Sequence, residues 1–201
     1  MRALCCVAIF GAALAARADD SGVQFGLRAA YMHPVGDIDA ETAFSDLIVG
    51  FVPVGVEAGY AFNRFVYLGG FGEYGFGFTH DCDASAPQCS AHSFAAGADL
   101  RVRLLPSSAV TPWIGLSAGY EWLVIDASNG GRGASAVLRG FRIVGVSTGL
   151  DFFTSRGVAV GPYASASLGR YTDAHVAGVG SPVDAAYHGF VQVGLRVSFL
   201  P

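Results

Sequence analysis

The sequence contains no lysine, and charged residues of any kind are scarce. All twelve basic residues are arginine, and the four charged residue types together make up 14% of the 201 residues. Charged side chains keep the surface of a soluble domain hydrated, and a small domain usually carries many of them. The composition therefore argues against a soluble domain with an ordinary lysine-rich surface.

Long hydrophobic runs are also missing beyond the N-terminus. Apolar residues make up 52% of the chain, yet no later stretch approaches the ~18 apolar residues of a membrane-spanning helix. High hydrophobicity without such a helix leaves two structures. One is a large soluble β core, and the other is a membrane β-barrel whose apolar side chains face lipid.

The N-terminus predicts export. Met1 and Arg2 precede an apolar run from Ala3 to Ala16, and small residues at Ala16 and Ala18 suit a cleavage site. This pattern is typical of a secretory signal peptide and is too short for a membrane anchor. We therefore expect residues 1–18 to be cleaved and residues 19–201 to form one mature domain. A cytosolic hydrophobic segment is the alternative.

Only four cysteines are present, and Cys5 and Cys6 would leave with the signal peptide. The remaining two, Cys82 and Cys89, are an even number in an exported chain, which predicts one disulfide. A metal site that adds the two nearby histidines is the alternative, but thiolates oxidise outside the cytoplasm. We predict no metal ion, and the sequence shows no motif for any other cofactor.

Acidic residues outnumber arginines in the expected mature domain. It keeps ten arginines and all sixteen acids, a formal net charge of −6, which argues against nucleic acid as a partner. Many of the acids fall in the polar stretches between the predicted strands. There they favour either simple solvation or the capture of divalent cations or a protein ligand, and the sequence leaves both open.

Eight segments alternate between apolar and polar residues, which predicts strands with two different faces. Each is long enough to cross a bilayer as a tilted strand. Long polar connections follow the first, third, fifth and seventh segments, including 123–138, and short turns follow the others. This sorting predicts an all-β, eight-stranded antiparallel up-and-down transmembrane β-barrel rather than a sandwich. The segments are Val23–Met32, Val52–Phe62, Phe65–Phe78, Phe94–Leu104, Trp113–Trp122, Arg139–Phe153, Val158–Tyr171 and Tyr187–Pro201.

A secreted barrel of the lipocalin type is the rival structure, and it would bury the apolar face instead of the polar one. Small and polar residues share one parity on every strand, as a narrow interior requires. Aromatic residues of the other parity gather near both strand ends, where membrane proteins place their aromatic girdles. These two features favour the membrane barrel.

The inward parity carries five arginines and five acids, so their charges cancel. Because buried charges are tolerated when they are paired, we expect an ion-pair network that plugs the narrow lumen. Its predicted members are Arg28, Glu57, Glu73, Asp99, Arg101, Arg103, Glu121, Arg139, Asp151 and Arg196.

Two further arginines, Arg142 and Arg170, fall on the outward parity. If Gly157 is left-handed in a short hairpin loop, Thr154 faces Val158 and the two arginines lie opposite one another near the outer rim. Like charges in this arrangement repel unless an anion lies between them, and lipopolysaccharide phosphate is the obvious anion at that depth. The alternative is that both side chains are hydrated above the membrane.

The last strand resembles the C-terminal assembly signal of bacterial outer-membrane barrels, through Gln192, Gly194, Val197 and Phe199. Leu200 and Pro201 follow, where such chains usually stop at the aromatic residue. Over nearly all of its mature length the chain resembles the small eight-stranded families of the outer-membrane-protein-A and -X type. We expect no periplasmic peptidoglycan-binding domain of the kind that the first of these families often carries.

The resemblance implies a monomer in the outer membrane of a Gram-negative bacterium, in contact with lipids, lipopolysaccharide and the barrel-assembly machinery. It also implies that the chain has a structural or surface-contact role, such as adhesion. The sequence does not identify the extracellular ligand. A narrow pore and a lipid-A-modifying enzyme are the alternatives. No Ser/His pair falls on one outward face, so we expect no enzymatic activity and no catalytic residues.

Overall fold

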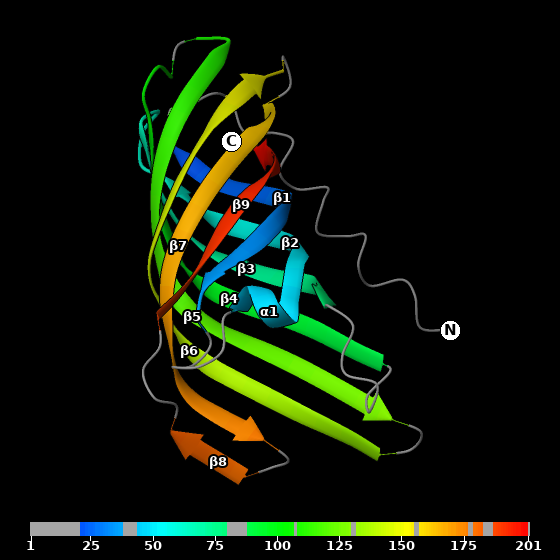
Figure 1. Ribbon diagram of the computed structural model, residues 1–201. Helices are drawn as coiled ribbons and strands as arrows, with labels where there is room; N and C mark the ends of the chain where they lie inside the picture. Colours follow the sequence, from blue (N-terminus) through cyan, green and yellow to red (C-terminus); the bar gives the residue numbers. More distant parts are fainter. Residues whose placement is uncertain are drawn as a thin grey trace, which may run out of the picture.

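The computed structural model describes residues 21–37, 44–79, 88–106, 108–129, 132–154, 157–176, 179–182 and 187–200. Eight antiparallel strands form a closed ring, because β6 pairs with β7 as well as with β5. Going round the barrel, the order is β1, β2, β3, β4, β5, β6, β7 and β9, and β9 pairs back onto β1 (Figure 1). The predicted eight-stranded up-and-down barrel is therefore confirmed. The barrel strands are β1 Gly22–Gly36, β2 Ile48–Ala61, β3 Val66–Thr79, β4 Gln88–Arg103, β5 Val110–Asn129, β6 Arg132–Phe153, β7 Val158–Val176 and β9 Tyr187–Phe199.

Two short elements accompany the barrel. The helix α1 spans Phe44–Leu47, and the strand β8, Val179–Pro182, pairs with the end of β7. Both lie toward the end that carries the long connections, which is the lower end in Figure 1, whereas the C-terminus lies at the upper end. No helix among the described residues is long and apolar enough to span a membrane.

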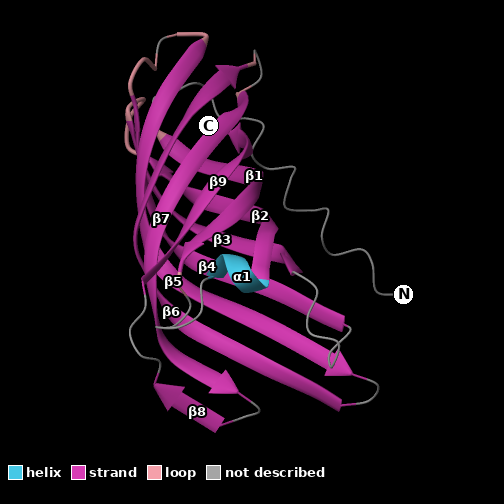
Figure 2. Ribbon diagram, viewed as in Figure 1, coloured by secondary structure: helices cyan, strands magenta, loops and turns pink. Residues whose placement is uncertain are grey.

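Several strands continue well into the stretches predicted as long loops. The stretch 123–138 is the clearest case, since β5 runs on to Asn129 and β6 starts at Arg132, so most of it is a β-hairpin (Figure 2). In this hairpin Leu123 and Leu138 are directly opposite one another and both are buried.

The outer face of the barrel is apolar. Its exposed side chains include Val193 and Leu195, each 62% exposed, and Val56 at 59%. Monomeric soluble proteins rarely expose contiguous apolar patches larger than a few hundred Å², whereas a barrel in a bilayer presents an apolar band about 25 Å tall. The polar face is buried, so this barrel has the arrangement of a membrane barrel and not that of a lipocalin.

Strand β6 contains an irregularity that changes which side chains face inward. Between Arg142 and Val144 the strand takes two steps while β7 takes one, and Ile143 and Val144 are both exposed. Such a bulge places an extra residue in one strand. Because side chains alternate with a period of two, one extra residue reverses the inward and outward faces beyond it.

Strands β6 and β7 approach one another closely at Gly161. A Cβ at Gly161 would overlap the carbonyl oxygen of Leu150 on the neighbouring strand, whereas a Cβ at Gly72 would meet only the Val56 side chain at 3.9 Å. We expect Gly161→Ala to lower the free energy of unfolding by about 3 kcal/mol, the upper part of the range for overpacking. Gly72→Ala should leave it unchanged or raise it by about 0.5 kcal/mol. Urea unfolding in phospholipid vesicles measures both, and equal effects would contradict the close approach.

Candidate functional site in the barrel interior

The interior of the barrel is lined by charged and polar side chains that contact one another across the lumen. Close to the short turns, the Arg103 Nη2 donates a hydrogen bond to Gln24 Oε1 at 2.9 Å, and both side chains are buried. Ser198 and Thr111, which are also buried, belong to the same end of the lumen. Asp151, which pairs with Thr111 in the strand register, is buried here as well.

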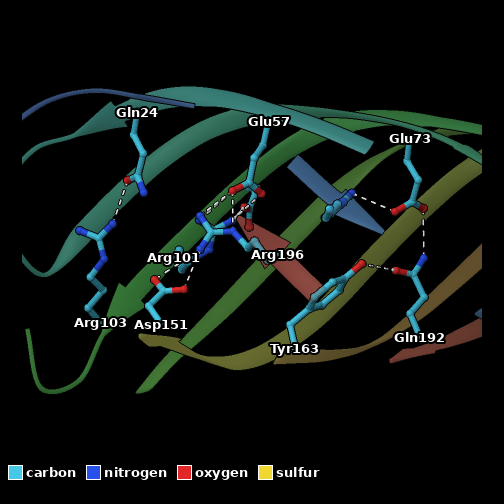
Figure 3. A network of polar contacts seen from close by, with 11 residues as sticks. Gln24, Glu57, Glu73, Arg101, Arg103, Asp151, Tyr163, Gln192 and Arg196 are labelled. Carbon is cyan, nitrogen blue, oxygen red and sulfur yellow. Dashed lines mark hydrogen bonds and ion pairs between the residues drawn. The ribbon is translucent and has the colours of Figure 1, made fainter. Parts of the chain in front are cut away.

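The centre of the lumen holds the densest group of charges (Figure 3). Glu57 accepts hydrogen bonds from Arg101 Nη2 at 2.9 Å and from Arg196 Nε at 2.6 Å. Arg196 also reaches Asp151 at 3.1 Å, and Arg101 pairs with Asp99. Two arginines and three acids from four strands are thus held in one cluster, in which each charge has an opposite partner.

Aromatic rings enclose this cluster. The Arg101 guanidinium lies 4.8 Å from the ring centre of Tyr67 and 4.9 Å from that of Trp113. Arg196 lies over the same Trp113 ring at 5.4 Å. Ring faces attract cations and exclude water at little cost in side-chain entropy. The arginines are therefore fixed both by their acids and by their ring contacts.

The next layer toward the long loops is centred on Glu73. Arg28 pairs with it at 3.2 Å, and Gln192 Nε2 donates a hydrogen bond to it at 3.0 Å. The Gln192 Oε1 in turn accepts a hydrogen bond from Tyr163 at 3.5 Å (Figure 3). Gln192, predicted as the polar position of the assembly signal, is buried here and links three strands across the lumen.

Beyond Glu73, toward the long loops, lies a group of side chains that contains a histidine. Arg142 reaches Glu121 at 3.3 Å and Glu73 at 3.8 Å, and Glu121 also contacts His188. The His188 ring stacks on Tyr171 with ring centres 3.9 Å apart and an angle of 12° between the planes. His188 and Glu121 are both buried, so this pair is closed off from solvent.

Apolar side chains fill the lumen at the long-loop end. Phe44 of α1 packs edge-on against Phe190, with ring centres 5.5 Å apart, and Phe51 packs in the same way at 6.2 Å. We call this group the apolar cap. Its buried members are Met32, Phe44, Ile48, Phe51, Ala91, Leu123, Leu138, Tyr171 and Phe190.

A small cavity lies between the charged layers. Its volume is about 30 Å³, and its lining includes the side chains of Arg28, Arg142, Ser147 and Ser165. A water molecule needs a cavity of at least 10–15 Å³ and two to four polar partners. This cavity therefore has room for water, and it is too small for an organic ligand.

The structure contradicts two of the sequence predictions for arginines. Arg142 was predicted to face outward, but it is 7% exposed and pairs with Glu73 and Glu121. Arg139 was predicted to face the lumen, but it is exposed and lies opposite Trp122 on the outer face. The bulge at Ile143 is the reason, because it reverses the parity that had been extended from Asp151 along β6.

The two residues that flank the turn, and Gly157, are nevertheless as that prediction expected. Gly157 has a φ of 71°, and the Thr154 N–H donates a hydrogen bond to the carbonyl oxygen of Val158 at 2.8 Å. Arg170 is exposed, as predicted, with Phe141 opposite it on β6. The error therefore arose inside the strand, not at the turn.

The remaining predicted residues lie in the interior, on the last strand or outside the described residues. Arg28, Glu57, Glu73, Asp99, Arg101, Glu121, Asp151 and Arg196 contact an opposite charge in the interior, and Arg103 contacts Gln24. Gly194, Val197 and Phe199 lie on β9. Residues 1–18 and Cys82 lie outside the described residues, so the signal peptide and the Cys82–Cys89 disulfide stay predictions.

Several interior residues were not singled out from the sequence. Trp113, Tyr67 and Phe71 share the inward parity of their strands, which is a signal that the sequence did contain. His188 shares the inward parity of Gln192 and Arg196 on β9, but a histidine at the start of a strand is usually solvated. Among the described residues, no group of three or more His, Cys, Asp or Glu side chains is arranged to hold a metal ion.

Comparison with known proteins supports the fold. No protein-family model matches the sequence, and no curated protein matches it. Among solved structures, Neisserial surface protein A is similar with a TM-score of 0.55 and 15% identity, over 89% of this chain and 99% of that one. The outer membrane protein AlkL, determined in lipid bilayers, has a TM-score of 0.53 and 9% identity over 92% and 93%. A major outer membrane protein from Thermus thermophilus has a TM-score of 0.51 and 9% identity over 89% and 100%.

Proposed function

We propose, on the premise that this chain is a β-barrel of the small eight-stranded outer-membrane type, that it is an integral outer-membrane protein with a closed lumen. Its role is structural or one of surface contact, such as adhesion, through the end that carries the long connections. The proposed location is the outer membrane of a Gram-negative bacterium, where lipid and lipopolysaccharide surround the barrel. The described barrel is complete in one chain, which favours a monomer.

The contents of the lumen carry this proposal. Five arginines and five acids are distributed through the interior, and the apolar cap lies across the long-loop end. The cavity between the charged layers has a volume of about 30 Å³. A hydrated ion needs a continuous wide path, whereas an eight-stranded barrel is about as wide as its own side chains fill. These observations favour a barrel that does not conduct.

The length of the strands supports a role at the surface. On β7, Val160 is opposite Phe152 and Arg170 is opposite Phe141. The two β7 residues are ten positions apart. At ~3.3 Å per residue and a tilt of about 40°, this distance corresponds to ~25 Å along the barrel axis, the height of an apolar band. Strand β5 continues beyond that band from Trp122 to Asn129. A paired hairpin therefore projects past the membrane, where it can meet a partner.

The buried histidine is not arranged for lipid chemistry. His188 and Glu121 lie inside the barrel beneath the apolar cap, and neither is accessible to lipid on the outer face. His33 faces outward but its Nδ1 lies 3.1 Å from the carbonyl oxygen of Val49. The proposal is therefore non-enzymatic, and altered lipid A in cells that express the chain would contradict it.

Two measurements test the proposed function. Purified full-length protein in planar lipid bilayers should give no stepwise conductance, and regular steps would show that the lumen is open. Surface contact is tested with bacteria that express either the full chain or a variant in which residues 124–137 are replaced by a two-residue turn. Adherence to cultured epithelial cells should fall in the variant while its membrane insertion is unchanged. Equal adherence of both, at equal insertion, would contradict a contact role for this hairpin.

A further inference from the structure

Two arginines stand on the outer face of the barrel at the edge of its apolar band. Arg170 on β7 lies between Phe141 on β6 and Tyr187 on β9, which are both 55% exposed. Arg139 on β6 lies opposite Trp122 on β5, two residues farther from the band than Phe141. The surrounding rings mark this height as a membrane interface, because amphipathic aromatic residues gather there.

The two side chains are close enough to share a ligand. Arg139 lies two residues from Phe141, which is directly opposite Arg170, and the pairing shifts by one residue between Arg139 and Gly140, so that Asp173 is opposite Arg139. Diagonal neighbours on adjacent strands are roughly 7–8 Å apart, which is within reach of long side chains. Both guanidinium groups can therefore approach one group that lies between them on the lipid side.

No ion pair neutralises these arginines within the part of the chain that the structure describes. Each salt bridge among the described residues involves either an interior arginine or His188. Asp173 lies opposite Arg139, but it is hydrogen-bonded by the Thr172 hydroxyl at 2.8 Å instead. Two unneutralised like charges beside apolar rings are unfavourable unless an anion compensates them.

We infer that Arg139 and Arg170 form a binding site for the phosphate group of a membrane lipid in the leaflet at the long-loop end. The guanidinium group donates two parallel hydrogen bonds to phosphate oxygens, which suits it to this ligand better than a hydrated lysine. The phosphate groups of a bilayer lie at the interface that Trp122 and Tyr187 mark, so the ligand is present at the height of the site. This inference rests on the proposed membrane location, and it replaces the pair Arg142 and Arg170 that the sequence suggested.

The test compares full-length protein in nanodiscs with the variant Arg139→Ala/Arg170→Ala. The probes are diphosphorylated lipid A, dephosphorylated lipid A and inorganic phosphate, and the readouts are retained lipid by native mass spectrometry and Trp122 fluorescence. We expect the double variant to bind diphosphorylated lipid A at least ten times more weakly. Arg64→Ala, at the short-turn end where Arg64 lies over Phe65, is the matched control and should bind normally.

Each outcome is decisive. Equal binding of diphosphorylated lipid A by the double variant and the wild type would overturn the site, as would equal binding of the dephosphorylated lipid. Saturation by inorganic phosphate alone, with no preference for the lipid, would overturn the membrane lipid as its ligand. Failure of the wild-type protein to enter nanodiscs would instead refute the proposed membrane location, so the two failures are distinguishable.

Discussion

Glu57→Gln is expected to lower the free energy of unfolding by about 3–5 kcal/mol, the range for breaking a buried ion pair on one side. Glu57 is 3% exposed and lies between two arginines, with Arg101 at 2.9 Å and Arg196 at 2.6 Å. The amide keeps the shape of the side chain but removes the negative charge. Both guanidinium groups then keep only one acid each, Asp99 and Asp151, in a site that water barely reaches.

Equilibrium urea unfolding in phospholipid vesicles measures this loss. The control is Asp126→Asn on β5, where the aspartate is exposed and makes no ion pair within the described residues. Exposed charges contribute about 0–1 kcal/mol, so the control should unfold like the wild type. If the two variants unfold alike, the interior charges do not stabilise the barrel.

Val193→Arg is expected to cost about 2–4 kcal/mol, because arginine is least tolerated at the middle of the lipid face. Val193 is 62% exposed on β9 and lies opposite Ala164 of β7, between the two ends of the apolar band. In water, an exposed valine replaced by arginine would change stability by no more than ~0.5 kcal/mol. The size of the effect therefore reports the medium around this face.

Position along the barrel provides the control for this substitution. Tyr187 is 55% exposed on the same strand and the same face, but it lies at the edge of the band. Tyr187→Arg should cost only about 0–1 kcal/mol, as expected near an interface. Equal costs at the two positions would indicate that the face is not graded by depth and is not in a bilayer.

The number of barrel strands, their order and the side that most of them bury follow from the sequence, because a period of two is a local property. The alternation of Val191, Val193 and Leu195 with Gln192, Gly194 and Arg196 on the last strand is an example. The structure exposes the first three and turns Gln192 and Arg196 inward. The outcome for these residues depends only on their immediate neighbours along the chain.

The predictions that failed depend on non-local features. One extra residue at Ile143 exchanged the faces of Arg139 and Arg142, and nothing in the sequence of β6 marks a bulge there. The apolar cap was missed for a different reason. Phe44 follows a polar stretch and packs against Phe190, 146 positions later in the chain, so only the closed barrel brings the two together. Charge balance survived because Arg142 took the place that had been given to Arg139.

Tryptophan fluorescence provides the most direct test of the central claim, that the apolar face meets lipid while the charged face is enclosed. The protein has two tryptophans: Trp113 inside the barrel, 2% exposed, and Trp122 on the outer face beside Phe94 and Tyr120. Each is observed alone in Trp122→Phe and Trp113→Phe variants inserted into vesicles of brominated phospholipid. We predict that bromine near the headgroup quenches Trp122 strongly and that neither bromolipid nor aqueous acrylamide quenches Trp113. Quenching of Trp113 by lipid, with Trp122 unaffected, would show that the two faces are reversed.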